Sequence, residues 1–192
     1  MEFEERVNWI RKVNPIVLVS VIGLMGSGKT NFAYWLYDNF FYDYQLVHYE
    51  SYFNSDKELI LNQIVEDVKT KKDAFIIFDD MSFIANTYTK DVNQFLSEIM
   101  RIRHSINHGV LVFIAHYRHS ILPVLREAHI VALTTLFPNQ FKDMSNIFTW
   151  DSMIDFSHDI MNFERKVLVW CYGKIWILKI PLSKTYREKY LK

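Results

Sequence analysis

The sequence predicts an α/β domain built around a mostly parallel sheet. Short, continuous apolar runs indicate buried strands, and stretches with helical character separate each run from the next. A glycine-bearing turn follows the first run, and a strand, a tight turn and a helix in that order are typical of a parallel α/β unit. The expected strands are residues 16–22, 45–49, 74–78, 110–115 and 130–136.

The segments between these strands carry helix signals. Apolar residues recur with a 3.6-residue period from Val92 to Ile106. Ser55, followed by charged residues, suits a helix start, and Pro123 suits the first turn of a short helix. The expected helices are residues 29–39, 55–69, 89–107 and 122–128.

The last third of the chain has a different character. Residues 137–163 are rich in aromatic residues and methionine, and we expect them to be helical in pieces. Residues 166–180 read as two strands around Tyr172-Gly173-Lys174, with glycine in the turn, which predicts an antiparallel hairpin at the sheet edge. We therefore expect one domain, residues 1–192, with its core in 15–136 and a C-terminal addition in 137–192.

Composition excludes several classes of protein. Half of the 192 residues are apolar and 16% are aromatic, which excludes intrinsic disorder. The 22 Lys and Arg residues balance 22 Asp and Glu residues, so binding of nucleic acid through bulk positive charge is not expected. The single cysteine, Cys171, cannot form an internal disulfide, which fits a reducing compartment. We expect no transmembrane segment, and the acidic residues 1–14 do not resemble a signal peptide.

Residues 23–30 form a phosphate-loop motif. They read Gly-Leu-Met-Gly-Ser-Gly-Lys-Thr and match G-x-x-x-x-G-K-[ST] in full, between an expected strand and an expected helix. In such a loop the glycines let backbone N–H groups converge on a phosphate, the lysine bridges β- and γ-phosphates, and the threonine hydroxyl ligates Mg²⁺. We expect ATP and Mg²⁺ as ligands, held by Gly23, Gly26, Ser27, Gly28, Lys29 and Thr30.

Two carboxylates follow the third expected strand. Asp79 and Asp80 come directly after the apolar run 75–78, and side chains alternate along a strand, so the two point differently. One carboxylate can hold the Mg²⁺ while the other orients or deprotonates a water near the γ-phosphate. We interpret the run as a Walker B element, with Asp79 as the metal ligand and Asp80 as the catalytic base.

These motifs, with the residues around the fourth strand, resemble a known family. Arg103-His104 closes the long expected helix, His116 comes at the end of the fourth expected strand, and Ile121-Leu-Pro-Val-Leu-Arg126 follows. The combination resembles the FtsK–HerA superfamily of ring-forming P-loop ATPases, in particular the genome-packaging ATPases of poxviruses and related DNA viruses. It covers residues 16–136. One departure is His116, where the family has a glutamine sensor; histidine can donate or accept as glutamine does, but it also titrates.

The resemblance implies a fold and a function. The fold is a RecA-like P-loop domain of the additional-strand type, with strand order 5-1-4-3-2. The function is an ATP-hydrolysing motor that translocates double-stranded DNA into a viral capsid. Such a motor works as a homo-oligomeric ring of five or six subunits, docks on a capsid or portal component, and is found in the host cytoplasm or the virion. Lys57, Lys69 to Lys72 and Lys142 are candidate DNA contacts.

Two further catalytic residues are expected. His116 is assigned as the sensor, with a satisfied core histidine as the alternative. Arg103 lies at the edge of the apolar stripe of the 89–107 helix, where a guanidinium needs a partner. We assign it as an arginine finger acting on the neighbouring subunit, with a buried ion pair within its own subunit as the alternative. Arg126 is a second candidate for the role in trans, and Arg118 is either a phosphate contact or a solvated loop residue.

Two other functions remain open. A secretion, conjugation or phage-assembly ATPase of the same superfamily would share this core. A shikimate-type or nucleoside kinase would share the loop, although residues 49–52 offer none of the arginines that such enzymes place after the second strand. Seven histidines suggest zinc, but the sequence has no cysteine pair and no H-E-x-x-H spacing, so we do not expect it.

Overall fold

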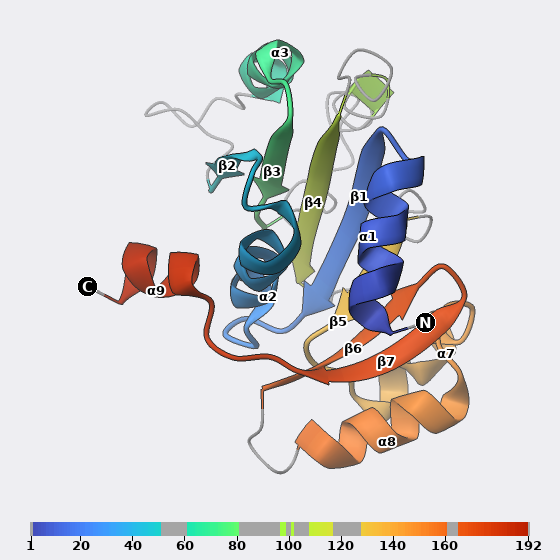
Figure 1. The fold of residues 1–192 in the computed structure, drawn as a ribbon. Coiled ribbons are helices and arrows are strands. Elements are labelled where there is room, and N and C mark those ends of the chain that lie inside the picture. Colours follow the sequence, from blue (N-terminus) through green and yellow to red (C-terminus); the bar gives the residue numbers. More distant parts are fainter. Residues whose placement is uncertain are drawn as a thin grey trace.

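The computed structural model describes residues 2–50, 61–80, 97–98, 101, 108–116, 128–160 and 165–191. In this part of the chain, seven strands form one sheet in the order β2-β3-β4-β1-β5-β6-β7 (Figure 1). The strands are β1 (Ile16–Gly23), β2 (Gln45–Tyr49), β3 (Ala74–Phe78), β4 (Gly109–His116), β5 (Ile130–Leu133), β6 (Lys166–Cys171) and β7 (Lys174–Lys179).

The first five strands form the parallel core of the sheet. β1 pairs with β4 on one side and β5 on the other, and β3 joins β4 to β2, all in parallel register. Read from β5, this order is 5-1-4-3-2, so the predicted α/β class and strand order are confirmed. Every residue of β1 is buried, because helices cover both faces of the sheet and the strand lies at its centre.

The C-terminal hairpin is also confirmed. β6 pairs antiparallel with β5 and with β7, so the hairpin extends the sheet at its β5 edge. Tyr172 and Gly173 link the two strands with φ of 45° and 80°, and two positive φ values suit the mirror-image turn that matches strand twist. One boundary is wrong: β5 ends at Leu133, not at residue 136, because Thr134 and Thr135 bind the loop after β1 instead.

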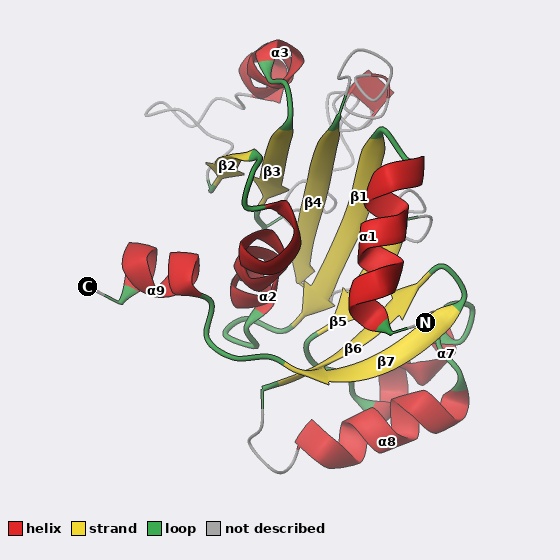
Figure 2. Cartoon of the chain, in the orientation of Figure 1, coloured by secondary structure: helices red, strands yellow, loops and turns green. Residues whose placement is uncertain are grey.

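Helices cover the two faces of the sheet in separate groups (Figures 1 and 2). One face carries α1 (Phe3–Val13), α2 (Lys29–Leu36) and the π-helical turn Tyr37–Phe41. The opposite face carries α3 (Leu61–Thr70), α7 (Phe141–Met144) and α8 (Trp150–Ile160), with a short 3₁₀ turn at Pro138–Gln140. α9 (Lys184–Tyr190) lies against α2.

Some predicted helices are present in the structure, the helix α1 was not predicted, and parts of other predicted helices lie outside the described residues. The helical pieces expected in 137–163 are present, and the helix expected at 29–39 is α2 followed by the π-helical turn. The sequence reading did not predict α1, although Phe3, Val7 and Ile10 follow a helical period and are buried. Of the 89–107 helix, residues 97, 98 and 101 are described and are helical. The start of the 55–69 helix and residues 122–127 lie outside the described residues.

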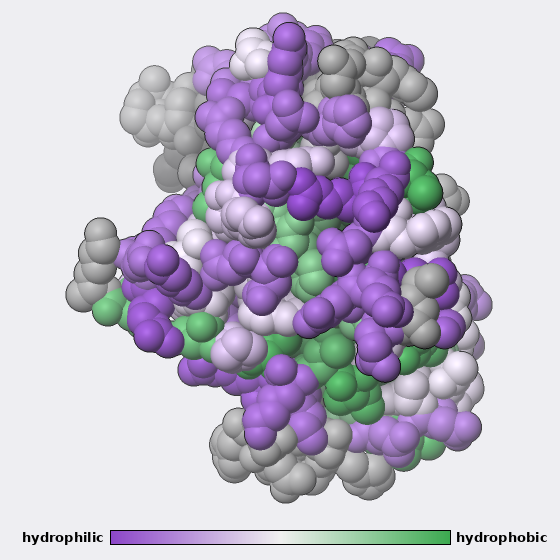
Figure 3. Space-filling view, in the orientation of Figure 1, coloured by the Kyte–Doolittle hydropathy of each residue, from purple (hydrophilic) through white to green (hydrophobic). Residues whose placement is uncertain are grey.

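Two apolar cores result, one on each face of the sheet. Side chains alternate along β1, so Val17, Val19 and Val21 pack toward α1 and α2, whereas Leu18 and Ile22 pack toward the opposite face. The surface over α1 and α2 is largely hydrophilic (Figure 3). In the described residues, no helix is long and apolar enough to cross a membrane.

Candidate functional site

The phosphate loop of residues 23–30 joins β1 to α2 at the carboxyl edge of the sheet (Figure 1). Gly26 and Gly28 have φ of 76° and 90°, in the left-handed region that glycine enters without strain. Gly28 is the N-cap of α2 and has no side chain with which to cap the helix. The loop therefore presents backbone N–H groups and the positive end of a helix, which suit an anion.

Glycine is needed at position 23 for a different reason, because a side chain there would clash with the residues that follow β5. A Cβ at this position would lie 2.1 Å from Thr134 Oγ1 and 2.7 Å from Ser27 Oγ. Those two hydroxyls are 2.5 Å apart, and Thr135 Oγ1 accepts from the Leu24 N–H at 2.8 Å. The two threonines hold the loop against the end of β5. Sequence reasoning missed both, although the strand order places whatever follows β5 beside the loop that follows β1.

Lys29 is buried and is folded back onto its own loop. Its side chain donates to the Leu24 carbonyl oxygen at 2.6 Å, and Nζ lies 3.1 Å from His116 Nδ1. Burial lowers the pKa of Lys29 to about 8, while the carboxylates of Asp79 and Asp80 partly oppose that shift. The ammonium thus lies among neutral acceptors inside the loop, where phosphate oxygens would be stronger partners.

Asp79 lies directly opposite Thr30. The Thr30 hydroxyl donates to Asp79 Oδ2 at 3.0 Å, and the Asp80 N–H donates to Asp79 Oδ1 at 2.8 Å. Burial raises the pKa of Asp79, but the nearby His48 ring and the hydrogen bonds from the Asp80 N–H and Thr30 outweigh burial, so the net shift of the pKa is downward. Asp79 is therefore held ionised beside a hydroxyl, and both groups offer the oxygen ligands that Mg²⁺ prefers.

Asp80 differs from its neighbour in backbone and in exposure. Its φ is 56°, in the left-handed region, which turns the side chain away from the path of β3. The side chain of Asp80 is 51% exposed, against 22% for Asp79. Water can therefore reach Asp80 more easily than Asp79.

His116 ends β4 and lies between the lysine and this second carboxylate. β4 pairs with β1 so that His116 is opposite Gly23. Nδ1 is 3.1 Å from Lys29 Nζ, and Nε2 is 3.6 Å from Asp80 Oδ1. An ammonium only donates, so Nδ1 is the acceptor, and Nε2 carries the proton that faces Asp80. The predicted residues Lys29, Thr30, Asp79, Asp80 and His116 thus come together at one edge of the sheet.

Two hollows adjoin on the phosphate loop. A hollow of about 270 Å³ is bordered by Lys29, Thr30, Asp79 and His116. A second, of about 180 Å³, lies between the loop and the C-terminal segment, and it is bordered by Arg165, Val167, Ile180 and Leu182. Both hollows share Gly26, Gly28, Asn31 and Tyr186.

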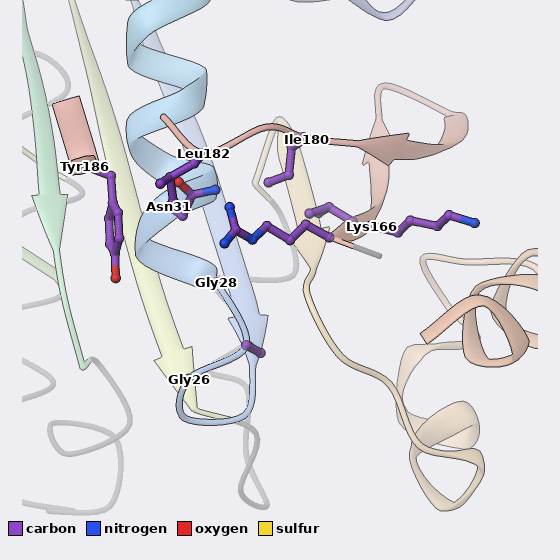
Figure 4. A pocket seen from close by; sticks show the side chains of 10 residues that line it. Gly26, Gly28, Asn31, Lys166, Ile180, Leu182 and Tyr186 are labelled. Atoms are coloured by element: carbon purple, nitrogen blue, oxygen red, sulfur yellow. The ribbon is translucent and has the colours of Figure 1, made fainter. Parts of the chain in front are cut away.

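Figure 4 shows the second hollow from close by. Ile180 and Leu182 lie near the start of α2 and beside Asn31, whereas the Lys166 side chain extends away from the loop. One wall is therefore apolar and comes from a segment for which the sequence offered no motif.

The described residues contain no group of three or more His, Cys, Asp or Glu side chains arranged to hold a metal. Thr30 and Asp79 supply two oxygens to the first hollow. Mg²⁺ commonly takes one or two protein ligands, with water and substrate phosphates completing its shell. The residues present fit that mode of binding and not a site built from protein ligands alone.

The other predicted residues are either not described or lie away from this site. Arg103, Arg118, Arg126 and Lys57 lie outside the described residues. Lys69 and Lys71 form ion pairs with Glu66 and Asp67 at 2.6 and 2.7 Å. Lys69 and Lys71 lie at the end of α3, which leads into the amino end of β3, so they are at the sheet edge opposite the phosphate loop.

No family model matches this chain, and no curated protein matches it. Among solved structures, it is similar to the genome packaging NTPase B204 from Sulfolobus turreted icosahedral virus 2. In complex with ATPγS, B204 gives a TM-score of 0.59 at 13% identity, covering 88% of this chain and 100% of that one. The sulfate complex of B204 gives 0.57 at 14% identity, covering 89% and 100%.

A second similar structure is the N-terminal domain of zonular occludens toxin from Neisseria meningitidis. It gives a TM-score of 0.50 at 13% identity, covering 90% of this chain and 97% of that one. At such identities the likeness concerns the fold. The fold is that of the P-loop NTPases, and the similarity to a viral packaging NTPase that the sequence indicated is confirmed at that level.

Proposed function

We propose that this protein is an ATPase of the viral genome-packaging type, which hydrolyses ATP to translocate double-stranded DNA. The observation that carries the proposal is the convergence of Lys29, Thr30, Asp79 and His116 on one hollow beside a phosphate loop. Asp80 lies next to this group, 3.6 Å from His116 Nε2. The fold similarity to the packaging NTPase B204 supports it.

Each residue has a separate task in this proposal. The loop N–H groups and Lys29 bind the β- and γ-phosphates. Thr30 and Asp79 hold Mg²⁺, which when bound neutralises phosphate charge. Asp80, the more exposed carboxylate, orients the attacking water and accepts its proton. His116 contacts both Lys29 and Asp80, so it is placed to sense whether the γ-phosphate is present.

The second hollow is suited to the nucleoside half of ATP. It adjoins the phosphate loop, one wall is apolar through Val167, Ile180 and Leu182, and Arg165 borders it. An apolar wall with one guanidinium suits a base and ribose, because the base buries apolar surface while the cation faces the base or the sugar.

Arg165→Ala tests that assignment. We expect its affinity for ATP to fall about three- to tenfold, the scale of one hydrogen bond or cation–π contact, because the nucleoside loses a partner. Its affinity for inorganic triphosphate, which has no nucleoside, should not change. Calorimetric titration of both ligands checks this, with Lys184→Ala as the control on exposed α9. Equal losses for both ligands would instead place Arg165 on the phosphates.

We further propose that the active site is completed in a homo-oligomeric ring of five or six subunits, docked on a capsid or portal component in the host cytoplasm or virion. Arg103 would act across the subunit interface on charge developing at the γ-phosphate. Its position at the edge of the apolar stripe in the sequence supports this role.

The motor is tested by ATP hydrolysis with and without double-stranded DNA, read beside the mass in solution. We expect stimulation by DNA in an oligomer. Arg103→Ala should bind ATP normally but hydrolyse it at least about tenfold more slowly, since arginine fingers contribute strongly to turnover. Mixing Arg103→Ala with Lys29→Ala should restore part of the activity, because some interfaces then combine an intact loop with an intact arginine. Rapid turnover by a strict monomer would contradict the ring.

A second candidate is a secretion, conjugation or phage-assembly ATPase, favoured by the fold similarity to the zonular occludens toxin domain. ATP hydrolysis without any response to DNA would favour it over packaging. Phosphate transfer to a small metabolite would instead indicate a kinase.

A further inference from the structure

The helix α9 is tied to α2, the helix that follows the phosphate loop. The Asn31 side chain donates to the Pro181 carbonyl oxygen at 3.2 Å and accepts from the Ser183 N–H at 2.9 Å. Asp38 accepts from the Ser183 hydroxyl at 2.6 Å and from the Thr185 N–H at 3.3 Å. These contacts fix the position of α9 along α2 and the π-helical turn that follows it, which carries Asp38.

This docking brings the end of α9 to the end of β2. Lys189 Nζ lies 2.6 Å from Glu50 Oε1, 3.1 Å from Tyr34 Oη and 3.2 Å from His48 Nδ1. The Tyr190 hydroxyl donates to the same oxygen of Glu50. The ammonium therefore lies between two acceptors, the Glu50 carboxylate and one nitrogen of His48.

The other nitrogen of His48 faces the candidate metal ligand. The His48 side chain is 4% exposed, and Nε2 lies 3.4 Å from Asp79 Oδ2. Nδ1 accepts, because Lys189 can only donate, so the neutral ring carries its proton on Nε2. No closer hydrogen-bond partner for Nε2 is present in the ranges that the structure covers. A buried N–H with no good partner is costly, so Asp79 is the group that it can stabilise.

We propose that His48 is a positioning residue for Asp79: it holds this carboxylate toward Thr30, where Mg²⁺ would bind, and α9 holds the ring through Lys189. The inference rests on the proposed binding of Mg·nucleotide. Side chains that orient metal ligands from behind change metal affinity without touching the metal. The sequence reading missed His48, because it is neither adjacent to Asp79 nor part of a motif.

Two substitutions of His48 distinguish a role in orienting Asp79 from a role in packing. In His48→Gln, the amide nitrogen reaches about as far as Nε2 and can donate to Asp79. In His48→Asn, it reaches only as far as Nδ1. We expect the Mg²⁺ concentration for half-maximal binding of a fluorescent ADP analogue to rise about tenfold in His48→Asn and to stay near wild type in His48→Gln. Binding of the analogue without Mg²⁺, and the unfolding temperature, should be similar in all three proteins.

The outcomes are distinguishable. If His48→Asn keeps the wild-type Mg²⁺ requirement, or if both variants lose metal-free binding equally, the positioning role is overturned. If the wild type itself binds no Mg·nucleotide, the proposed function fails first.

Lys189→Met tests the contribution of α9 without altering the buried ring, so it remains informative if His48→Asn does not fold. We expect the Mg²⁺ requirement to rise about threefold, less than for His48→Asn, since Tyr34 still contacts Nδ1 at 2.6 Å. Lys184→Met removes an exposed lysine from the same helix and is the matched control. An equal response of the two lysine variants would show that α9 acts only through its charge, and it would overturn the link to His48.

Discussion

Lys29→Ala is expected to abolish ATP hydrolysis and to weaken nucleotide binding about ten- to a hundredfold. The ammonium is the main point charge of the phosphate loop, and one charge-assisted hydrogen bond contributes about 1.5–3 kcal/mol. In the structure, Lys29 Nζ contacts the Leu24 carbonyl oxygen and His116. Calorimetric titration with ATP and a phosphate-release assay measure the two effects.

The same variant separates loss of function from loss of fold. The pKa of Lys29 is lowered to about 8 by burial, so at pH 7 the folded protein carries a charge that its surroundings disfavour. Removing that charge relieves a cost, and nucleotide-free Lys29→Ala should unfold close to the wild-type temperature. Lys184→Ala, on the exposed face of α9, should match the wild type in every assay. Wild-type turnover by Lys29→Ala would remove the proposed function.

Asp80→Asn is expected to retain Mg·ATP and to lose turnover by about a hundredfold or more, the usual contribution of a general base. The change isolates the charge, because asparagine tolerates the left-handed backbone that Asp80 adopts at a φ of 56°. The Asp80 N–H would still donate to Asp79, so the metal ligand stays in place. Single-turnover hydrolysis beside equilibrium binding checks both parts.

Asp79→Asn is the companion variant, and we expect the opposite pattern. It keeps the contact with Thr30 but loses the negative charge that Mg²⁺ prefers, so the Mg²⁺ requirement should rise about tenfold. At saturating Mg²⁺, turnover should recover in Asp79→Asn but not in Asp80→Asn. A reversed pattern would exchange the two roles within the pair and leave the Walker B assignment unchanged.

The parts of the site that could be predicted all come at the end of an apolar run, including His116, which the family resemblance singled out. Residues 23–30 and the pair Asp79-Asp80 are contiguous, and each follows an apolar run that forms a strand, so local pattern places them together. His48 has no such signal. It reaches Asp79 only because β2 pairs with β3, and a lone histidine on a strand is common in any fold.

The helix α9 and its contacts near the site could not be predicted from the sequence, for a related reason. α9 reads Lys-Thr-Tyr-Arg-Glu-Lys-Tyr, and none of its residues is buried, so no apolar period predicts it. Its place depends on side-chain hydrogen bonds to Asn31 and Asp38, more than a hundred residues earlier. Thr134 and Thr135 had a usable signal, since the strand order 5-1-4-3-2 already put β5 beside β1.

The central position of β1 has a consequence for how the protein is made. Its two neighbours, β4 and β5, both come much later in the sequence. During synthesis this apolar strand leaves the ribosome with neither partner available, and pairing over such distances along the chain is slow. A fragment that ends after β3 would contain the whole phosphate loop yet expose both hydrogen-bonding edges of β1. Such a fragment is an aggregation hazard and cannot serve as a minimal nucleotide-binding unit.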